Sequence, residues 1–212
     1  MTSRWLGGAV LTGMWLFAAA VFGRLPARIP THWNLAGEVD GWMPKMPGAF
    51  VGPASASLVF AILVLMPQID PRRSNVARST GDRQIVANAV VLFLALLEVL
   101  SLGVALGWPI DMTAAVTGSL GLLMVCIGNY LPRIRSNWWI GIRTPWTMDD
   151  ERVWRDTHRL GGRLFVLGGL ALLPLAAVRT DMRGILVLAV ILTAALVPAV
   201  YSFIAWRRTR AS

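Results

Sequence analysis

The stretch IVANAVVLFLALLEVLSLGVAL, residues 85–106, decides the fold of this chain. A helix of this length can cross a bilayer, because an α-helix rises about 1.5 Å per residue and the hydrocarbon core is about 30 Å thick. The one ionisable side chain in the stretch is Glu98. A run so long and so apolar predicts a membrane-spanning helix rather than part of a soluble core.

Five further stretches have the same character. The composition agrees, since 56% of the 212 residues are hydrophobic and only 15% are charged, whereas soluble domains have about 25% charged residues. We therefore predict an all-α fold, a six-helix transmembrane bundle with an extracytoplasmic loop and a cytoplasmic amphipathic helix. The first stretch is long and five others follow, so we interpret it as a retained helix rather than a signal peptide. The predicted spans are residues 5–23, 49–66, 85–106, 112–130, 164–178 and 184–205.

The arginines predict the orientation of the bundle. With both termini placed in the cytoplasm, 15 of the 20 Lys and Arg residues fall on the cytoplasmic side and 5 on the outer side. This asymmetry follows the positive-inside rule. The net charge of +9 would also suit nucleic-acid binding, but cations that flank spans are interpreted as topology signals, so we expect no direct contact with nucleic acid.

The outer loop, residues 24–48, contains a polar cluster. One interpretation is a ligand or metal site, and the other is a polar turn in which Asn and Asp side chains bind their own backbone. One histidine and a few acids show no recognisable metal spacing, so we expect a structured outer lid and no metal. The candidate outer-loop residues are His32, Trp33, Asn34, Gly37 and Asp40.

A polar block at residues 128–162 has no anchoring purpose, so we expect function there. Thr147 and the acids after it predict a helix start near Met148, and Gly161-Gly162 predict its end or a bend. Two interpretations stay open: an interfacial helix with a basic face near anionic lipid, and a docking surface for a partner or ligand. The candidate ligand- or partner-binding residues are Asn129, Arg133, Asn137, Arg143, Thr144, Trp146, Glu151, Trp154, His158 and Arg159.

Catalysis has weak support in the sequence. His158 and Glu151 fall on one helix face and could act as general acid and base on lipid headgroups. The chain has no Ser elbow, His-Glu-x-x-His motif or phosphate loop, so we expect no enzymatic activity and no cofactor. The single cysteine, Cys126, is interpreted as a packing residue.

Glu98 supports a different hypothesis. A carboxylate inside a span is costly unless it is paired, protonated or in a watery cavity, so it is a candidate functional residue. A small-solute or ion transporter would use it directly. The alternative is a structural carboxyl satisfied by another span.

We interpret the segment before the third span, Arg72 to Arg83, as a flexible, basic linker. We divide the chain into residues 1–66, a two-span unit with the outer loop; 67–111, the linker and third span; and 112–212, the unit with the polar block and spans four to six.

The two polar regions together resemble the SdpI family of bacterial membrane proteins. The outer loop, with Pro30, His32-Trp33-Asn34, Gly37, Asp40 and Pro44-Lys45, resembles the domain of unknown function that begins such proteins. The inner run resembles the family's signature segment through Gly128-Asn129-Tyr130-Leu131-Pro132, Asn137, Gly141-Ile142-Arg143-Thr144-Pro145-Trp146-Thr147 and Thr157-His158-Arg159. Order and spacing fit over nearly the whole chain. Arg133 stands where the family usually has Lys, which keeps the charge.

The resemblance implies a multi-pass protein of the bacterial plasma (inner) membrane that acts by immunity and signal transduction. Such a protein protects its cell from a secreted toxic peptide that attacks the lipid bilayer. It also sequesters a small DNA-binding repressor at the membrane. The peptide would meet the outer side, and the repressor would meet the cytoplasmic side.

Overall fold

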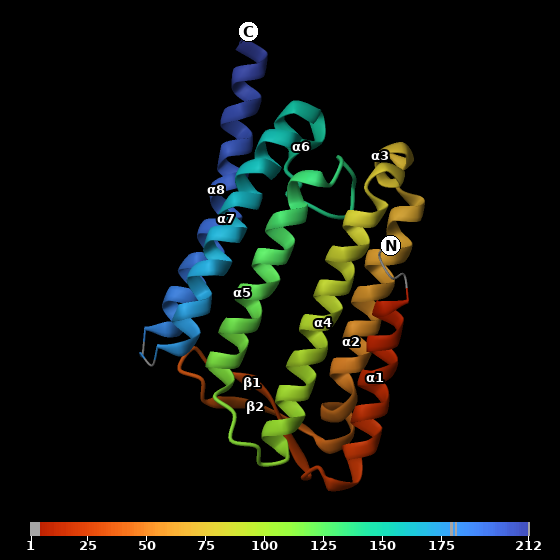
Figure 1. Cartoon of the computed structure of the whole chain (residues 1–212), viewed down its shortest axis with the longest axis vertical. Helices are drawn as coiled ribbons and strands as arrows, with labels where there is room; N and C mark the ends of the chain where they lie inside the picture. Colours follow the sequence, from red (N-terminus) through yellow and green to blue (C-terminus); the bar gives the residue numbers. More distant parts are fainter. Residues whose placement is uncertain (1–4, 179, 181, 212) are drawn as a thin grey trace.

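The computed structural model describes residues 5–178, 180 and 182–211 as a bundle of long helices closed at one end by a hairpin (Figure 1). Six helices are long and apolar enough to cross a membrane, which confirms the predicted six-helix, all-α architecture. They are α1 (Leu6–Val21), α2 (Lys45–Leu65), α4 (Thr80–Ala105), α5 (Met112–Tyr130), α7 (Glu151–Ala177) and α8 (Arg183–Ala211).

Short elements connect these helices. The outer loop contains two antiparallel strands that the sequence analysis did not predict, paired from Arg28↔Pro44 to Trp33↔Val39. The hairpin lies across the end of the bundle where α4 ends and α5 begins (Figure 1). The short elements are η1 (Phe22–Arg24), β1 (Arg28–Trp33), β2 (Val39–Pro44), η2 (Met66–Ile69), α3 (Arg73–Arg78), η3 (Leu131–Arg133) and α6 (Pro145–Asp149).

Helices α5 and α7 pack closely because glycines face each other across their contact. A Cβ added at Gly128 would lie 2.7 Å from the carbonyl oxygen of Gly162, and one added at Gly169 would lie 2.5 Å from that of Gly121. Small residues let helix backbones approach in this way in membranes. Gly162 therefore serves packing. The predicted helix end at Gly161-Gly162 is wrong, because α7 continues to Ala177 and joins the amphipathic segment to the fifth span.

The predicted flexible linker is also wrong. Helix α3 occupies its middle, and α4 begins at Thr80. Asp70 is fully buried and accepts hydrogen bonds from the backbone N–H of Arg72 (2.7 Å) and of Trp138 (2.8 Å). The Arg72 guanidinium donates to the Ser136 hydroxyl and to the Met148 carbonyl. These bonds hold the segment against the polar block.

Two caps replace the single helix start predicted at Met148. Thr144 caps α6, with its hydroxyl accepting from the Thr147 backbone N–H (3.2 Å) in a capping box. Asp150 caps α7 by accepting from the backbone N–H of Arg152 at 2.6 Å. The predicted cap, Thr147, is the third residue of α6 and is fully buried.

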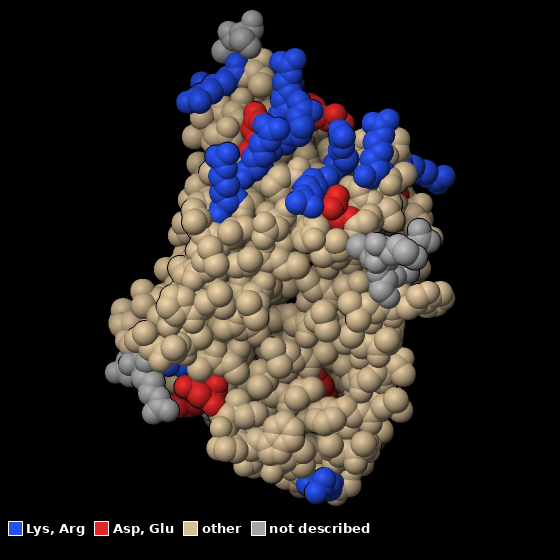
Figure 2. Space-filling model, viewed as in Figure 1, with Lys and Arg blue, Asp and Glu red and all other residues tan. Residues whose placement is uncertain are grey.

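Charge divides the molecule along its length. Figure 2 shows Lys and Arg gathered at the end that carries α3, α6 and the last turns of α8, whereas few lie at the hairpin end. We call these the basic end and the hairpin end. This uneven distribution of Lys and Arg is the signal that the positive-inside rule uses to orient a membrane protein.

Candidate functional site

The polar block folds into a compact, hydrogen-bonded region at the basic end, which we call the polar cluster, and Asn137 lies at its centre. This side chain is 1% exposed. Its Oδ1 accepts from the backbone N–H groups of Trp139 and Ile140, both at 2.8 Å. Its Nδ2 donates to the carbonyls of Arg135 (2.9 Å) and Ile140 (3.0 Å). All four hydrogen-bonding positions of the amide are filled, so Asn137 shapes the loop.

His158 joins the same loop to α7. Its Nε2 accepts from the backbone N–H of Ile142 at 3.0 Å, so this nitrogen carries no proton. Its Nδ1 therefore donates to the Trp154 carbonyl at 2.8 Å, the only tautomer that satisfies both contacts. The ring is fully buried and stacks on Trp154 with centroids 4.0 Å apart. A histidine with both nitrogens occupied does not offer a free base.

Gly141 makes this contact possible. Its φ of +125° lies in the region that favours glycine. A Cβ there would lie 2.4 Å from His158 Nε2 and 3.0 Å from the Trp154 ring. The backbone turn at Gly141 thus passes directly over the histidine.

Helix α6 is tied to the last turns of α8. The Thr144 and Ser202 hydroxyls are 2.9 Å apart, and the rings of Trp146 and Phe203 are 5.0 Å apart. The carboxylate of Asp149 accepts from Trp206 Nε1 (2.6 Å) and from the Arg210 guanidinium (2.8 Å). The Trp206 hydrogen bond, followed by that from Arg210, lowers the pKa of Asp149.

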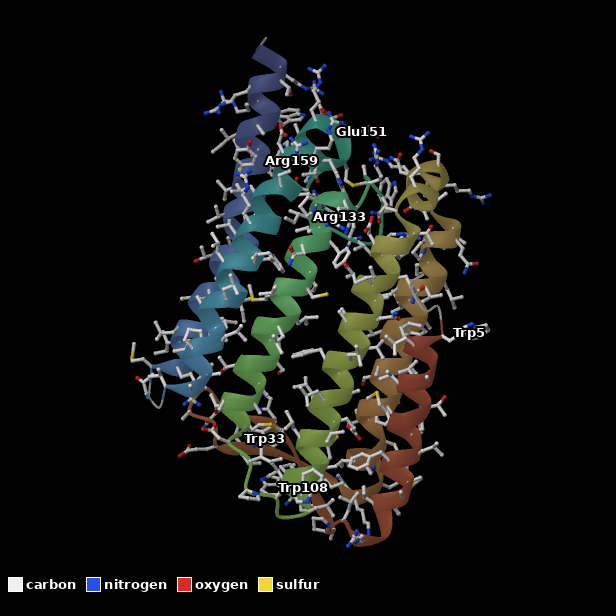
Figure 3. The ribbon with its side chains drawn as sticks, in the orientation of Figure 1. Trp5, Trp33, Trp108, Arg133, Glu151 and Arg159 are labelled. Atoms are coloured by element: carbon white, nitrogen blue, oxygen red, sulfur yellow. The ribbon has the colours of Figure 1, made fainter. Side chains whose placement is uncertain are left out.

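Only part of the predicted binding set reaches the surface. Asn137, Trp154 and His158 are buried, and Thr144 and Trp146 are partly buried against α8. The exposed members lie around the basic end, where Figure 3 labels three of them. They are Asn129, Arg133, Arg143, Glu151 and Arg159.

Glu151 and His158, the acid–base pair considered from the sequence, are not hydrogen-bonded to each other among the described residues. Glu151 Oε1 accepts from Asn75 Nδ2 at 3.2 Å, and both nitrogens of His158 are occupied as above. Arg133 lies over the Tyr130 ring at 5.1 Å. A pocket of about 230 Å³ lies beside Arg133, Arg135 and Arg155. The surface is suited to contact with anionic groups or with a partner.

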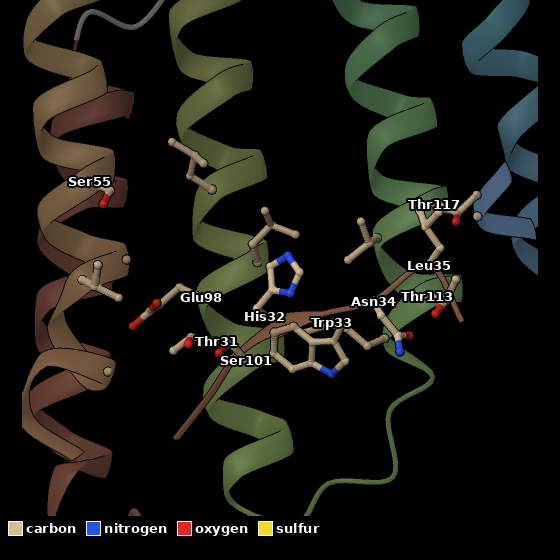
Figure 4. Close-up of a pocket in the computed structure, with 18 of the residues that line it drawn as sticks. Thr31, His32, Trp33, Asn34, Leu35, Ser55, Glu98, Ser101, Thr113 and Thr117 are labelled. Atoms are coloured by element: carbon tan, nitrogen blue, oxygen red, sulfur yellow. The ribbon is translucent and has the colours of Figure 1, made fainter. Parts of the chain in front are cut away.

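A second, larger pocket of about 450 Å³ lies at the hairpin end. Residues 31–35 form one wall, and helices α2, α4, α5 and α8 form the others (Figure 4). Figure 2 shows this face of the molecule hollowed between the α4 and α5 sides of the bundle. The outer loop is therefore the covering of a pocket, as the lid interpretation predicted.

Hydrogen bonds and close contacts fix the hairpin. Asn34 Oδ1 accepts from the backbone N–H groups of Ala36 (2.9 Å) and Glu38 (3.0 Å), which confirms the predicted polar turn. His32 Nδ1 and Asp40 Oδ1 are 2.5 Å apart across the two strands. At the tip, Gly37 has a φ of +86° and lies against Thr113 of α5.

The tip of the hairpin also contacts α8. A Cβ on Gly184 would lie 2.5 Å from the carbonyl oxygen of Leu35. Beside it, Arg183 and Asp111 form an ion pair at 3.4 Å that joins the start of α8 to the start of α5. The tip of the hairpin is therefore held between the start of α5 and the start of α8.

Glu98 lies in this pocket and points from α4 toward α2 (Figure 4). It is 6% exposed, and its Oε1 has no hydrogen-bond partner among the described residues. A Cβ on Gly52 of α2 would lie 1.8 Å from Glu98 Oε2, so Gly52 makes room for the carboxylate. Glu98 comes seven residues before the end of α4, which places it about 10 Å from the hairpin end of that helix.

The structure thus brings together two features that the sequence analysis treated separately, the outer loop and Glu98. It also adds Gly52, Ser55 and Ser101 to the pocket, and Ser101 Oγ donates to the Pro30 carbonyl at 2.9 Å. Small residues one turn apart on α2 were the only sequence signal for this space. Among the described residues, no three His, Cys, Asp or Glu side chains are placed to hold a metal ion.

Two family descriptions match the chain. The SdpI/YfhL protein family matches residues 133–202, which include the polar block from Arg133, the last residue of η3, onward. The domain of unknown function DUF1648 matches residues 9–56, which include the whole hairpin. The matched segments therefore contain most of the polar cluster at one end of the bundle and the hairpin at the other.

One curated relative aligns along almost the whole chain. It is the immunity protein SdpI of Bacillus subtilis (strain 168), which is 22% identical over 200 residues, or 93% of this chain and 92% of the relative. No solved structure matches the chain. Six candidate spans make the chain a multi-pass membrane protein, and with both family segments present in this order it is similar to the SdpI/YfhL family.

Proposed function

We propose that this protein is an immunity protein that protects its cell from a membrane-active toxic peptide. The observation that carries the proposal is the alignment with an immunity protein over 93% of the chain and 92% of the relative. An alignment that covers both the hairpin and the polar block supports a shared function rather than a shared fold of one segment. The occupied nitrogens of His158 support a role without enzymatic chemistry.

The proposed orientation places the hairpin end outside and the basic end with both termini in the cytoplasm. The clustering of Lys and Arg at the basic end (Figure 2) supports it. In this orientation the pocket behind the hairpin is the part of the molecule that meets a secreted peptide.

A further part of the proposal is sequestration of a small DNA-binding repressor by the basic end. The exposed side chains of Arg133, Glu151 and Arg159 (Figure 3) offer a charged surface. The polar cluster beneath these side chains is held by buried hydrogen bonds. The backbone of the surface is therefore already ordered, which reduces the entropy cost of binding a partner. Loss of membrane recruitment of the repressor in an Arg133→Ala, Arg159→Ala double variant would test this part.

Transport through Glu98 is the competing function, because Glu98 lies in a pocket. A transporter would move a solute into vesicles, and Glu98→Gln would abolish the flux. An immunity protein would show no such flux and would still protect cells.

The experiment that tests immunity is survival of a sensitive host. Cells with the full chain and cells with an empty vector are challenged with an amphipathic killing peptide encoded by the same genome. We expect the full chain to raise the inhibitory concentration of the peptide roughly tenfold, a tenfold change in binding being worth about 1.4 kcal/mol if protection follows capture of the peptide one for one. Equal killing of both strains, with the protein present in the membrane, would contradict the proposal.

A further inference from the structure

The pocket at the hairpin end contains a carboxylate for which the described residues offer no counter-charge. Glu98 is 6% exposed and Oε1 is unpaired among the described residues. A buried carboxylate is costly unless a proton or a cation neutralises it. No Lys or Arg is among the described residues that line the pocket, and the one histidine there, His32, is paired with Asp40. The described residues therefore place no cation beside Glu98, which leaves room for one carried by a ligand.

The walls of the pocket decide what kind of cation fits. Most of them are apolar, with Val51, Leu94, Leu97, Val116 and Val187 among the lining residues. The volume of about 450 Å³ is in the range of about 300–1,000 Å³ that suits small organic groups. A bare metal ion would leave these walls empty, whereas a charged group on an apolar chain would fill them.

The position of the pocket decides the route of entry. The hollow in Figure 2 lies on the flank of the bundle, between the α4 and α5 sides. Glu98 is about 10 Å along α4 from the hairpin end, a depth that the apolar part of a membrane-inserted molecule reaches. An occupant therefore enters from the bilayer.

Two kinds of amphipathic amine are present at a membrane, peptides and aminophospholipids. An aminophospholipid carries a phosphate next to its amine. The described lining has no Lys or Arg to pair with that phosphate, and Glu98 would repel it. A lysine side chain or an N-terminal amine of a peptide carries no such anion, so the pocket favours the peptide.

We infer that this pocket binds a protonated primary amine carried on an apolar segment of the toxic peptide, with Glu98 as its counter-ion. The inference rests on the proposed function, since immunity supplies the peptide. Glu98 thus engages the ligand directly, and Gly52 keeps the space around its carboxylate open.

The test measures the thermal stability of the purified full chain in detergent with n-octylamine as the probe. n-Octanol, which has the same apolar chain and no charge, is the matched control. A ligand that binds the folded state raises the melting temperature with concentration. We expect octylamine to stabilise the protein and octanol to have a much smaller effect. Glu98→Gln should weaken the apparent affinity for octylamine roughly tenfold or more.

Two further variants separate binding from general damage. Gly52→Ala keeps the charge of Glu98 but puts a methyl group where Oε2 lies, so it should also weaken octylamine binding. Glu151→Gln removes an exposed carboxylate at the opposite end and should bind octylamine like the unchanged protein. Equal stabilisation by octanol, or equal octylamine binding by Glu98→Gln, would overturn the inference.

The source of the amine is tested in the same way. A short amphipathic peptide with one lysine should stabilise the protein, and its lysine-acetylated form should not. Stabilisation by dihexanoylphosphatidylethanolamine but not by the lysine peptide would show a lipid site and overturn the assignment to a peptide. These measurements use no toxin, so they can fail while cells stay protected, and cell protection can fail while octylamine still binds.

Discussion

The imidazole Nε2 of His158 accepts the backbone N–H of Ile142 at 3.0 Å, so a side chain of α7 completes the hydrogen bonding of a loop sixteen residues before it. This bond fixes the neutral tautomer and places the ring under the Gly141 turn. His158 thus stabilises the loop conformation at the basic end and does not itself reach the surface.

Replacing His158 by Ala should destabilise the protein by about 2–4 kcal/mol, because it leaves the partly buried N–H of Ile142 unpaired and opens a cavity at a fully buried ring. Thermal unfolding of the purified protein would measure the loss. Arg159→Ala is the matched control, since this neighbour is exposed and should change stability by less than about 0.5 kcal/mol. Similar stability of the two variants would show that the hydrogen bonds of His158 do not hold the loop to α7.

Gly141→Ala should destabilise the fold by more than Gly107→Ala. Both glycines have positive φ, +125° and +84°, so an alanine at either position would have backbone strain of about 1–3 kcal/mol. Only Gly141 also has the His158 ring within 2.4 Å of the added methyl, whereas nothing lies within 4 Å at Gly107. The difference between the unfolding midpoints of the two variants measures the cost of the clash with His158. Equal midpoints would show that this clash has no effect on stability.

Asn137→Ala should cost several kcal/mol, on the order of 3, because four hydrogen bonds are lost from a buried site. Asn129→Ala removes one exposed bond to the Val125 carbonyl and should cost less than about 1 kcal/mol. Denaturation of both variants checks the prediction. A mild effect of Asn137→Ala would mean that the loop keeps its shape without this amide.

The tie between Asp149 and the end of α8 should depend on pH. The folded protein has a lowered pKa at Asp149, because Trp206 and then Arg210 donate to the carboxylate. The tie therefore contributes fully above the ordinary Asp pKa of about 4 and is lost as the pH falls through the lower, folded value. Hydrogen exchange of residues 203–210, corrected for the intrinsic effect of pH, measures it.

Asp149→Asn is the control for that measurement. In this variant, protection of the end of α8 should not change between pH 7 and pH 3. If the unchanged protein also shows constant protection over this range, the carboxylate does not hold the helix.

Hydrophobic length was enough to predict the six spans, because a bilayer demands long apolar helices whatever their packing. The turn at Asn34 was also predictable, since Asn bonds its own backbone. The strands of the hairpin, Arg28–Trp33 and Val39–Pro44, were missed although Ile29, Trp33, Val39 and Trp42 favour strands. The polar residues within and between them, such as Asp40 and Asn34, interrupt the alternation of polar and apolar side chains that marks a strand.

Tertiary contacts explain the other errors. The segment after Asp70 looked flexible, but the buried Asp70 and Arg72 anchor it to residues more than sixty positions later. The Gly161-Gly162 pair looked like a helix end, but Gly162 packs against α5. The pocket that unites Glu98 with the outer loop joins four helices and a strand, which no local pattern reveals.

The most direct test of the account is survival under peptide challenge of cells that carry the unchanged protein, Glu98→Gln or Glu151→Gln at equal membrane levels. The account predicts that Glu98→Gln loses protection while Glu151→Gln keeps it, because the peptide engages the pocket behind the hairpin. Full protection by Glu98→Gln would contradict the account.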